Sequence, residues 1–332
     1  MTKDWRIYNG KKSSDCKTTL ADIKDTKPNW RDKTKADHNA KTFDLFDNND
    51  LVNAVNAAIY LRRPLLVTGK PGIGKSSLAK SIAEELTTLK KPLHWQITSK
   101  SRLKEGLYSY DALARLQDLQ MKKMYHELGE FDKSKGINTD IGDYIKLGVL
   151  GKAFLSTKPC VVLIDEIDKS DLDLPNDLLH IFEEQDFEID EVKRSKEVNI
   201  KVDGYDIPDD GKIECKGDFP IIVMTSNGER DFPPAFLRRC ISVNISLPND
   251  KEQQIGLLTK MVLGHFDADS FVDKDDSKLK TKLEELVSEF VDLKVDDGIL
   301  LSNDQLLNAA FLVLNSDMGI EDFKTSLLSA LE

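Results

Sequence analysis

Eight consecutive residues have the types and the spacing that bind phosphate. Gly69–Ser76 fits the pattern G-x-x-x-x-G-K-[ST], in which glycines let backbone N–H groups turn inward around phosphate oxygens. A helix that starts directly afterwards adds partial positive charge. The pattern predicts that Lys75 reaches the β and γ phosphates of a nucleotide and that the Ser76 hydroxyl ligates Mg²⁺. The residues that we expect to bind the nucleotide and its metal are Gly69, Pro71, Gly72, Ile73, Gly74, Lys75, Ser76, Ser77 and Asp165.

Two carboxylates at the end of an apolar run form the second candidate group. Asp165 and Glu166 directly follow Val161–Ile164, which is typical of a buried parallel strand. Ligands bind outside the carboxyl ends of such strands. We therefore expect Asp165 to hold the Mg²⁺ sphere and Glu166 to orient and polarise an attacking water. Alone the pair is a weak signal, because Asp-Glu also caps helices, but its place after Lys75 in an α/β chain strengthens it.

Two further groups of polar residues follow later strands. Asn227 comes after Met224-Thr225-Ser226 and is predicted to hold the attacking water, although a turn residue before Gly228 is a credible alternative. Arg238 and Arg239 precede the last strand. They are candidates for an arginine finger that acts on the nucleotide of an adjacent subunit, and the alternative is a solvated or salt-bridged pair.

These residues need a scaffold, and apolar periodicity indicates an α/β one. Strands are expected over 64–68, 93–97, 161–164, 221–224 and 241–245. Helices are expected over 51–61, 75–89, 109–128 and 178–184. The alternation predicts a mainly parallel, three-layer α/β domain over 42–248. After residue 248 the pattern is helical, over 251–264, 277–293, 302–315 and 320–331, so 249–332 is predicted to be a separate helical domain.

Two insertions, residues 99–143 and 187–218, extend the predicted domain. The second is expected to form a hairpin in which 187–190 pairs with 198–202. Tyr108 and Tyr110 in the first are candidates to grip a substrate, and packing against the following helix is the favoured alternative.

Charge is distributed unevenly along the 332 residues, whose formal net charge is −11. Residues 1–41 carry 11 Lys/Arg and 6 Asp, a net of +5, so the rest of the chain carries −16. We expect 1–41 to be an extended or partly disordered arm, either solvated or docked on an acidic surface such as that of a neighbouring subunit. The acidic body disfavours nucleic acid as a partner, because phosphate contacts need clustered cations.

Apolar runs and cysteines bear on the compartment. No run approaches the roughly 20 residues that span a bilayer, and the N-terminus has no signal-peptide core. Cys16, Cys160, Cys215 and Cys240 are far apart, without zinc-finger spacing. We expect reduced thiols in the cytoplasm, no membrane association and no structural metal.

The motifs together resemble those of AAA+ ATPases. Gly69–Ser76, Ile164–Ile167, Thr225–Asn227 and Phe236–Arg239 are similar to Walker A, Walker B, sensor 1 and arginine finger. Within AAA+ proteins, the phrases that resemble the MoxR group are 63–68, 165–170, 178–184 and 232–236. Two more distinctive stretches, 97–112 and 174–179, are similar to MoxR-like ATPases of multi-gene bacterial systems with von Willebrand A domain partners. The resemblance covers about 50–248 and not 1–41.

The resemblance implies a fold and an activity. The sheet order would be 5-1-4-3-2, with ATP and Mg²⁺ between the α/β domain and a helical lid. Members hydrolyse ATP as rings, commonly hexamers, and in a chaperone-like way they remodel or activate partner proteins, often ones with a von Willebrand A domain. Arg239 is the better finger match and Arg238 the second. One departure is clear: the last arginine is Arg239, so the lid has no sensor 2 arginine. Either Lys294 substitutes or the lid uses another contact.

The residues leave three other functions open. A monomeric P-loop kinase or GTPase is disfavoured, because no Asn-Lys-x-Asp guanine signature occurs and the arginine pair makes better sense in trans. An AAA+ protein acting on nucleic acid is disfavoured by charge. A regulatory ATP-binding module that hydrolyses poorly is disfavoured by Glu166, which has no obvious binding role.

Overall fold

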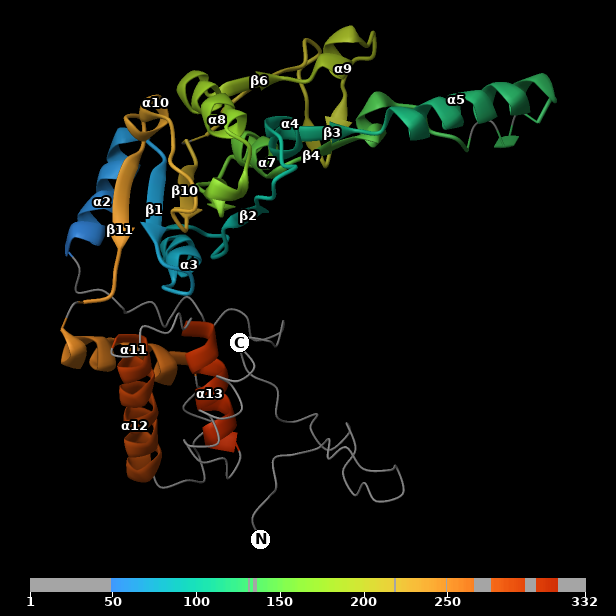
Figure 1. The fold of residues 1–332 in the computed structure, drawn as a ribbon. Helices are drawn as coiled ribbons and strands as arrows, with labels where there is room; N and C mark the ends of the chain where they lie inside the picture. The colour runs from blue at the N-terminus through green and yellow to red at the C-terminus, as the bar shows by residue number, and fades with distance from the viewer. Residues whose placement is uncertain are drawn as a thin grey trace, which may run out of the picture. The chain divides into compact units, whose positions relative to one another are not determined.

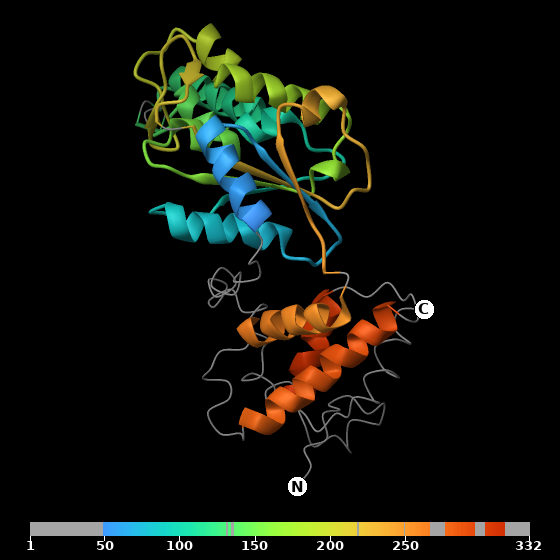
Figure 2. The same cartoon turned by 90° about the vertical axis from the view of Figure 1, so that its left-hand side faces the viewer.

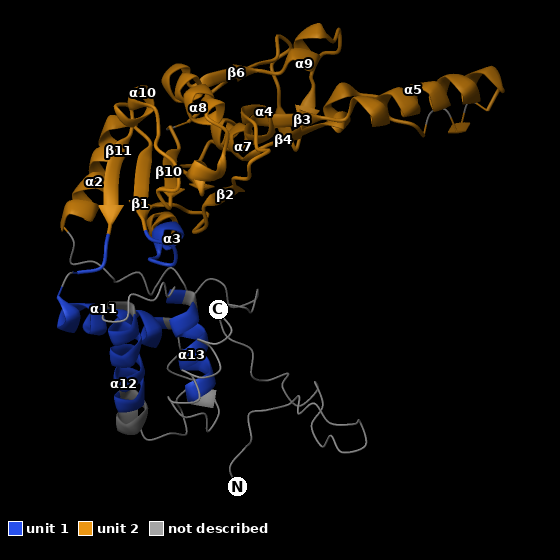
Figure 3. Cartoon of the chain, in the orientation of Figure 1, with its two compact units in different colours: residues 1–47, 70–77, 246–332 blue, residues 48–69, 78–245 orange. Residues whose placement is uncertain are grey.

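The computed structural model describes residues 49–130, 132–133, 136–217, 219–248, 250–265, 276–295 and 303–315. The predicted arm 1–41 and the predicted helix 320–331 lie outside these residues. The chain divides into two compact units (Figure 3), one of residues 1–47, 70–77 and 246–332 and the other of residues 48–69 and 78–245.

Five parallel strands form the central sheet of the second unit, in the order β11-β1-β10-β5-β2. Numbered along the chain, this is 5-1-4-3-2, so the predicted fold class and strand order are confirmed. The strands are β1 (Leu65–Gly69), β2 (Leu93–Gln96), β5 (Val161–Asp165), β10 (Ile221–Ser226) and β11 (Ile241–Ile245).

The central strands are apolar because both of their faces are covered. Residues 65–67 of β1 and 161–164 of β5 are all buried, as a parallel sheet between two layers requires. Helix α2 (Asn49–Leu61) packs on β11 and β1, and α7 (Val149–Leu155) packs on β2 and β5 (Figures 1 and 2).

The remaining helices vary in length from 4 to 16 residues. The phosphate-binding motif leads directly into α3 (Lys75–Leu86), as predicted, and the helix predicted at 178–184 begins earlier. The others are α4 (Leu103–Leu107), α5 (Ala112–Glu127), α8 (Asp173–Glu184), α9 (Asp190–Arg194) and α10 (Pro234–Leu237), with 3₁₀ turns η4 (Ile141–Tyr144) and η5 (Ile167–Lys169).

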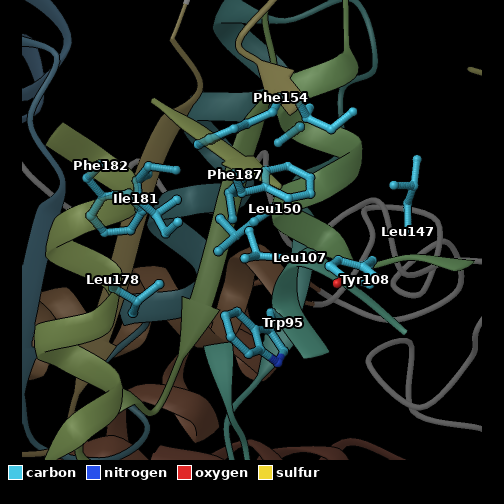
Figure 4. Close-up of a cluster of buried hydrophobic side chains, with 14 of the residues drawn as sticks. Trp95, Leu107, Tyr108, Leu147, Leu150, Phe154, Leu178, Ile181, Phe182 and Phe187 are labelled. Carbon is cyan, nitrogen blue, oxygen red and sulfur yellow. The ribbon is translucent and has the colours of Figure 1, made fainter. Parts of the chain in front are cut away.

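Aromatic side chains fill the core where α7 and α8 meet the inserted strands (Figure 4). The rings of Phe154 and Phe187 lie 6.1 Å apart between centroids. Tyr108 is buried in the same cluster, and its hydroxyl donates to Glu191 Oε2 at 2.7 Å. Burial and this bond raise the pKa of Tyr108 far above its usual range. Tyr108 therefore packs within the core, but against Phe187 and α9, whereas the favoured alternative placed it on the helix that follows.

The insertions form three small antiparallel pairs, and the predicted hairpin is wrong. Phe187 pairs with Ile213, and Val202 pairs with Tyr205. The reason is a two-residue turn at Asp203-Gly204, both with positive φ, which is the geometry of a tight hairpin. The pairs are β3 (Tyr108–Tyr110) with β4 (Ile145–Leu147), β6 (Asp186–Glu188) with β9 (Lys212–Glu214), and β7 (Lys201–Val202) with β8 (Tyr205–Asp206).

Helix α5 extends away from the sheet (Figure 1) and is attached by its polar face. Asp118 accepts a bond from the Tyr144 hydroxyl at 2.7 Å, and Lys122 donates to Thr139 at 3.2 Å. Its apolar side chains are exposed, with Leu116 52% and Met124 47% accessible. The predicted helix exists, but its apolar face does not enter the core of this unit.

Three helices make up the described part of the other unit beyond residue 248. They are α11 (Lys251–His265), α12 (Asp276–Val295) and α13 (Asn303–Asn315), close to their predicted bounds. They share a core of Leu258, Met261, Val262, Leu283, Leu286, Val287, Phe290, Val291, Leu306, Leu307, Ala309, Ala310 and Val313. Throughout the described ranges, no helix is long and apolar enough to cross a membrane.

Candidate functional site

The sheet brings three chemically important strand ends to one edge. In the register of the sheet, Thr68 of β1 lies opposite Ser226 of β10, and Met224 of β10 lies opposite Ile164 of β5. All three strands run in the same direction, so Gly69, Asp165 and Asn227 follow at a common carboxyl edge. This is the edge at which open parallel sheets bind ligands.

Two glycines of the loop at 70–77 adopt positive φ values. Gly72 and Gly74 have φ values of +75° and +93°, which glycine adopts without steric cost. Lys75 is 7% exposed, and its ammonium donates to the carbonyl of Lys70 at 2.9 Å. The lysine is therefore folded onto its own loop, beside the backbone groups that would surround a phosphate.

Asp165 is held from two sides. The Thr225 hydroxyl donates to Asp165 Oδ1 at 2.5 Å, and His94 Nε2 lies 3.3 Å from Oδ2. Thr225 is buried at the end of β10, and His94 is on β2. These contacts fix the carboxylate at the sheet edge.

Glu166 has a left-handed backbone, with φ +59° and ψ +50°. For a residue other than glycine such a conformation costs about 1–3 kcal/mol, and it occurs mainly where the surroundings enforce it. The Glu166 N–H donates to the Thr225 hydroxyl at 2.9 Å. The carboxylate Oε2 accepts bonds from Gln96 at 2.6 Å and Lys169 at 2.8 Å. The bond to Glu166 raises the pKa of Lys169.

Asn227 lies at the same edge, and its backbone is held by a buried carboxylate. Asp168 is 2% exposed, and its Oδ2 accepts the N–H groups of Asn227 at 2.9 Å and of Glu229 at 3.1 Å. This anchors the turn that follows β10 to the turn that follows β5. The predicted grouping of Asp165, Glu166 and Asn227 at one edge is thus what the structure contains.

The two arginines lie at the opposite edge. They follow α10 and precede β11, whose first residue Ile241 lies opposite Leu65 at the start of β1. Arg239 forms a salt bridge with Glu183 and donates to the carbonyl of Ala235 at 3.4 Å. Arg238 is exposed. The structure therefore does not bring the arginines to the Asp165 edge of the same chain.

Four residues around the carboxylates had no assigned side-chain role in the sequence: Thr225, Gln96, His94 and Asp168. A usable signal existed for two of them. Strand 2 adjoins strand 3 in the expected order, so Gln96 at its end must lie beside Asp165, and the register places them opposite each other. Thr225 precedes Asn227 on the neighbouring strand by two residues. Nothing in the sequence indicated the role of Asp168.

The described residues contain no group of three or more His, Cys, Asp or Glu side chains that could hold a metal ion on their own. A site completed by a phosphate ligand is not of that kind, because Mg²⁺ is usually bound by one or two protein groups together with phosphate oxygens and water.

Comparisons with known structures show distant likenesses. NtrX from Brucella abortus bound to ADP is 13% identical, with a TM-score of 0.44, over 86% of this chain and 54% of that chain. This chain thus spans about half the length of NtrX. A putative ATPase from Cytophaga hutchinsonii is 14% identical, with a TM-score of 0.39, over 87% and 85% of the two chains. A chain in a structure of the complex between subunits BchI and BchD of magnesium chelatase is 16% identical, with a TM-score of 0.36. The match covers 74% of this chain and 70% of that chain.

Comparisons at the level of sequence are more decisive. No curated protein matches the chain. A protein-family model described as AAA domain (Cdc48 subfamily) matches residues 63–288. That span contains β1, the phosphate loop, both carboxylates and the arginine pair, and it exceeds half of the chain; the protein therefore belongs to this family of AAA+ proteins.

Proposed function

We propose that the protein is a MoxR-like AAA+ ATPase that binds and hydrolyses ATP at the subunit interfaces of a ring. The observation that carries this proposal is the Thr225 hydroxyl, which joins the Asp165 carboxylate to the backbone of Glu166. Two strands are thereby locked so that both carboxylates lie at the edge where β1 ends and the phosphate loop begins.

The loop supplies the phosphate contacts in this proposal. Its N–H groups and the Lys75 ammonium are the donors. Lys75 exchanges the Lys70 carbonyl for phosphate oxygens, which is favourable because a charged acceptor forms a stronger bond than a neutral one.

The donors present fit Mg²⁺. The Asp165 oxygens contact Thr225 and His94, and a carboxylate has about four lone-pair sites in all, so its oxygens are of the kind that ligate a metal. Together with the Ser76 hydroxyl this gives the oxygen ligands that Mg²⁺ prefers. When bound, the ion neutralises charge that develops on the phosphates. Asp165 and Ser76 would hold it.

Glu166 is the general base in this mechanism, and Asn227 positions the water. The Glu166 carboxylate accepts bonds from Gln96 and Lys169, and the attacking water would replace one of them. The carboxylate then accepts a proton from the water as it attacks the γ-phosphate.

The position of the two arginines supports the ring in this proposal. Because Arg239 and Arg238 lie at the edge away from Asp165, they are better placed to act on a neighbour's nucleotide than on their own. We extend this to a hexamer of cytoplasmic subunits in which hydrolysis remodels a partner protein with a von Willebrand A domain. The resemblance of 97–112 and 174–179 to MoxR-like sequences supports that choice of partner.

Two variants test the nucleotide chemistry. Lys75→Ala should abolish ATP binding, because the loop loses its point charge. Glu166→Gln should bind ATP and not hydrolyse it. Glu184→Gln is the matched control, because Glu184 is exposed at the end of α8. Binding of a fluorescent ATP analogue and phosphate release are measured for each. Near-normal turnover by Glu166→Gln would show that Glu166 is not the base.

A further inference from the structure

The first residue of α13 holds the phosphate loop by a side-chain bond. Asn303 is 4% exposed, and its Nδ2 donates to the carbonyl oxygen of Gly72 at 2.9 Å. The same nitrogen lies 3.8 Å from the sulfur of Met261 on α11. Asn303, Gly72 and Met261 belong to one compact unit. A buried amide is thus shared between the helical core and the loop.

The two backbones approach closely at this point. A Cβ on Gly72 would lie 3.1 Å from the backbone nitrogen of Asn303 and 3.4 Å from its Cβ. Gly72 also has a φ of +75°, which side chains rarely adopt. The motif itself leaves this position open to any residue, so the contact with α13 gives a specific reason for glycine here.

The bond fixes the orientation of one peptide group in the loop. In a trans peptide the C=O and the following N–H point in opposite directions. The Gly72 carbonyl points at Asn303, so the N–H of Ile73 points to the other side of the loop, away from α13. An inward backbone N–H is what phosphate oxygens need from such a loop. Without the bond, the peptide could rotate and withdraw this donor.

We propose that Asn303 is a positioning residue for nucleotide binding, which holds the Gly72–Ile73 peptide in its phosphate-binding orientation before the nucleotide arrives. This rests on the proposed function. Asn303 is uncharged and acts through the loop backbone, so it lowers the reorganisation needed for binding rather than attracting the phosphates itself.

The alternative is that Asn303 only starts α13. Asp suits the start of a helix as well as Asn does, since its charge is favourable there. Asp nevertheless lacks an N–H donor and would place a carboxylate against the Gly72 carbonyl. Asn303→Asp therefore preserves a helix-start role and removes the positioning role. Asn308→Asp is the control, because it makes the same change further along α13.

The experiment titrates the full chain with a fluorescent ATP analogue and Mg²⁺. Asn303→Ala should weaken binding about 2- to 12-fold, which corresponds to one hydrogen bond. Asn303→Asp should weaken it more, while Asn308→Asp should match the wild type. Hydrolysis measured over a range of ATP concentrations should show a raised KM with little change in kcat. The melting temperature without nucleotide shows whether each variant is folded.

The outcomes separate this inference from the function on which it rests. If folded Asn303→Asp binds the analogue as tightly as the wild type, the positioning role is wrong and the ATPase assignment is unaffected. If the wild type fails to bind the analogue, both are wrong. Should Asn303→Asp not fold, Asn303→Ala decides by the same comparison of affinity.

Discussion

Thr225 is the residue on which the geometry of both carboxylates depends. Its hydroxyl donates to Asp165 and accepts from the Glu166 N–H, although Glu166 has a left-handed backbone. A strained residue of this kind stays in place only if its neighbours hold it. Glu166, the proposed base, is therefore positioned by the adjacent strand β10 as well as by its own strand β5.

Replacing Thr225 tests this arrangement. Thr225→Val keeps the shape and removes the hydroxyl, which leaves the partly buried Glu166 N–H without that acceptor. We expect a loss of about 1–3 kcal/mol in the free energy of unfolding, measured by urea denaturation, together with a lower kcat. Thr225→Ser keeps the hydroxyl and should therefore retain most of the stability and most of the kcat. If Thr225→Ser is impaired while Thr225→Val retains stability and kcat, the role belongs to the methyl group and not to the hydroxyl.

Burial of two cysteines predicts how slowly their thiols react with a labelling reagent. Burial raises the pKa of Cys160 to about 11 and that of Cys240 to about 12. In a Cys16→Ser background, a soluble thiol reagent at pH 8 should label both only after unfolding, because the thiolate is the reactive form. Cys215 is half-buried and should react first. Fast labelling of Cys240 in the native protein would contradict its burial.

The same pKa shifts affect stability. Both thiols have folded pKa values above the unfolded value of about 8.5. Their contribution to stability is therefore fully present below that pH and is lost as the pH rises through 11 to 12. The urea midpoint should accordingly fall between pH 8 and pH 11, and Cys160→Ala with Cys240→Ala should reduce the fall.

At the scale of elements, α5 is attached by its polar face, whereas an ordinary surface helix packs by its apolar face. Its polar residues face the protein, through Asp118 and Lys122, and its apolar residues face outward. Desolvation together with the bond to Asp118 raises the pKa of Tyr144 to about 12, so the hydroxyl remains a donor to Asp118 well above neutral pH.

A pair of leucine variants tests this orientation. Leu116→Ser on α5 should change the free energy of unfolding by less than about 0.5 kcal/mol, because the side chain is already exposed. Leu150→Ala in the core should cost about 2–5 kcal/mol. Both are measured by urea denaturation. A loss of several kcal/mol from Leu116→Ser would mean that α5 packs by its apolar face.

The elements also show what the sequence can and cannot predict. β1, β5, β10 and β11 were predictable, because apolar runs between turn residues admit few alternatives. The α5 helix was predictable from its period, but its orientation was not, since the periodic pattern does not say which face meets the protein. The predicted pairing of 187–190 with 198–202 failed because the Asp203-Gly204 turn pairs Val202 locally with Tyr205, which leaves Phe187 to pair with Ile213.

Some residues of the candidate site could likewise be predicted from the sequence, and others could not. Lys75, Asp165, Glu166 and Asn227 were predictable because motif and strand end coincide. Asn303 was not, because its contact with Gly72 joins residues 231 positions apart through helix packing that no local pattern encodes. The sensor 2 substitute Lys294 stays a prediction, since its side chain lies outside the described residues.

At the scale of the whole molecule, the arginine edge predicts cooperation between subunits. Arg239→Ala should bind ATP and be inactive alone, because a finger contributes about 10³–10⁵ to the rate. Mixed with Glu166→Gln subunits it should regain activity, as some interfaces then combine an intact base with an intact finger. Phosphate release from the mixtures is the measurement. If Arg239→Ala with Arg238→Ala stays fully active, the trans site is absent, and Glu183 holds Arg239 for stability only.

The strand order has a consequence for how the chain is made. β1 lies between β10 and β11, so that Leu65 is opposite Val223 and Ile241, and both neighbours are synthesised more than 150 residues later. During synthesis on the ribosome, the apolar strand β1 therefore has neither β10 nor β11 to pair with while the insertions emerge. Contacts of such sequence separation make folding slow, and the exposed strand is prone to aggregate. The nucleotide-binding strand is thus completed almost last, and nascent chains that stop before residue 221 should depend on chaperones.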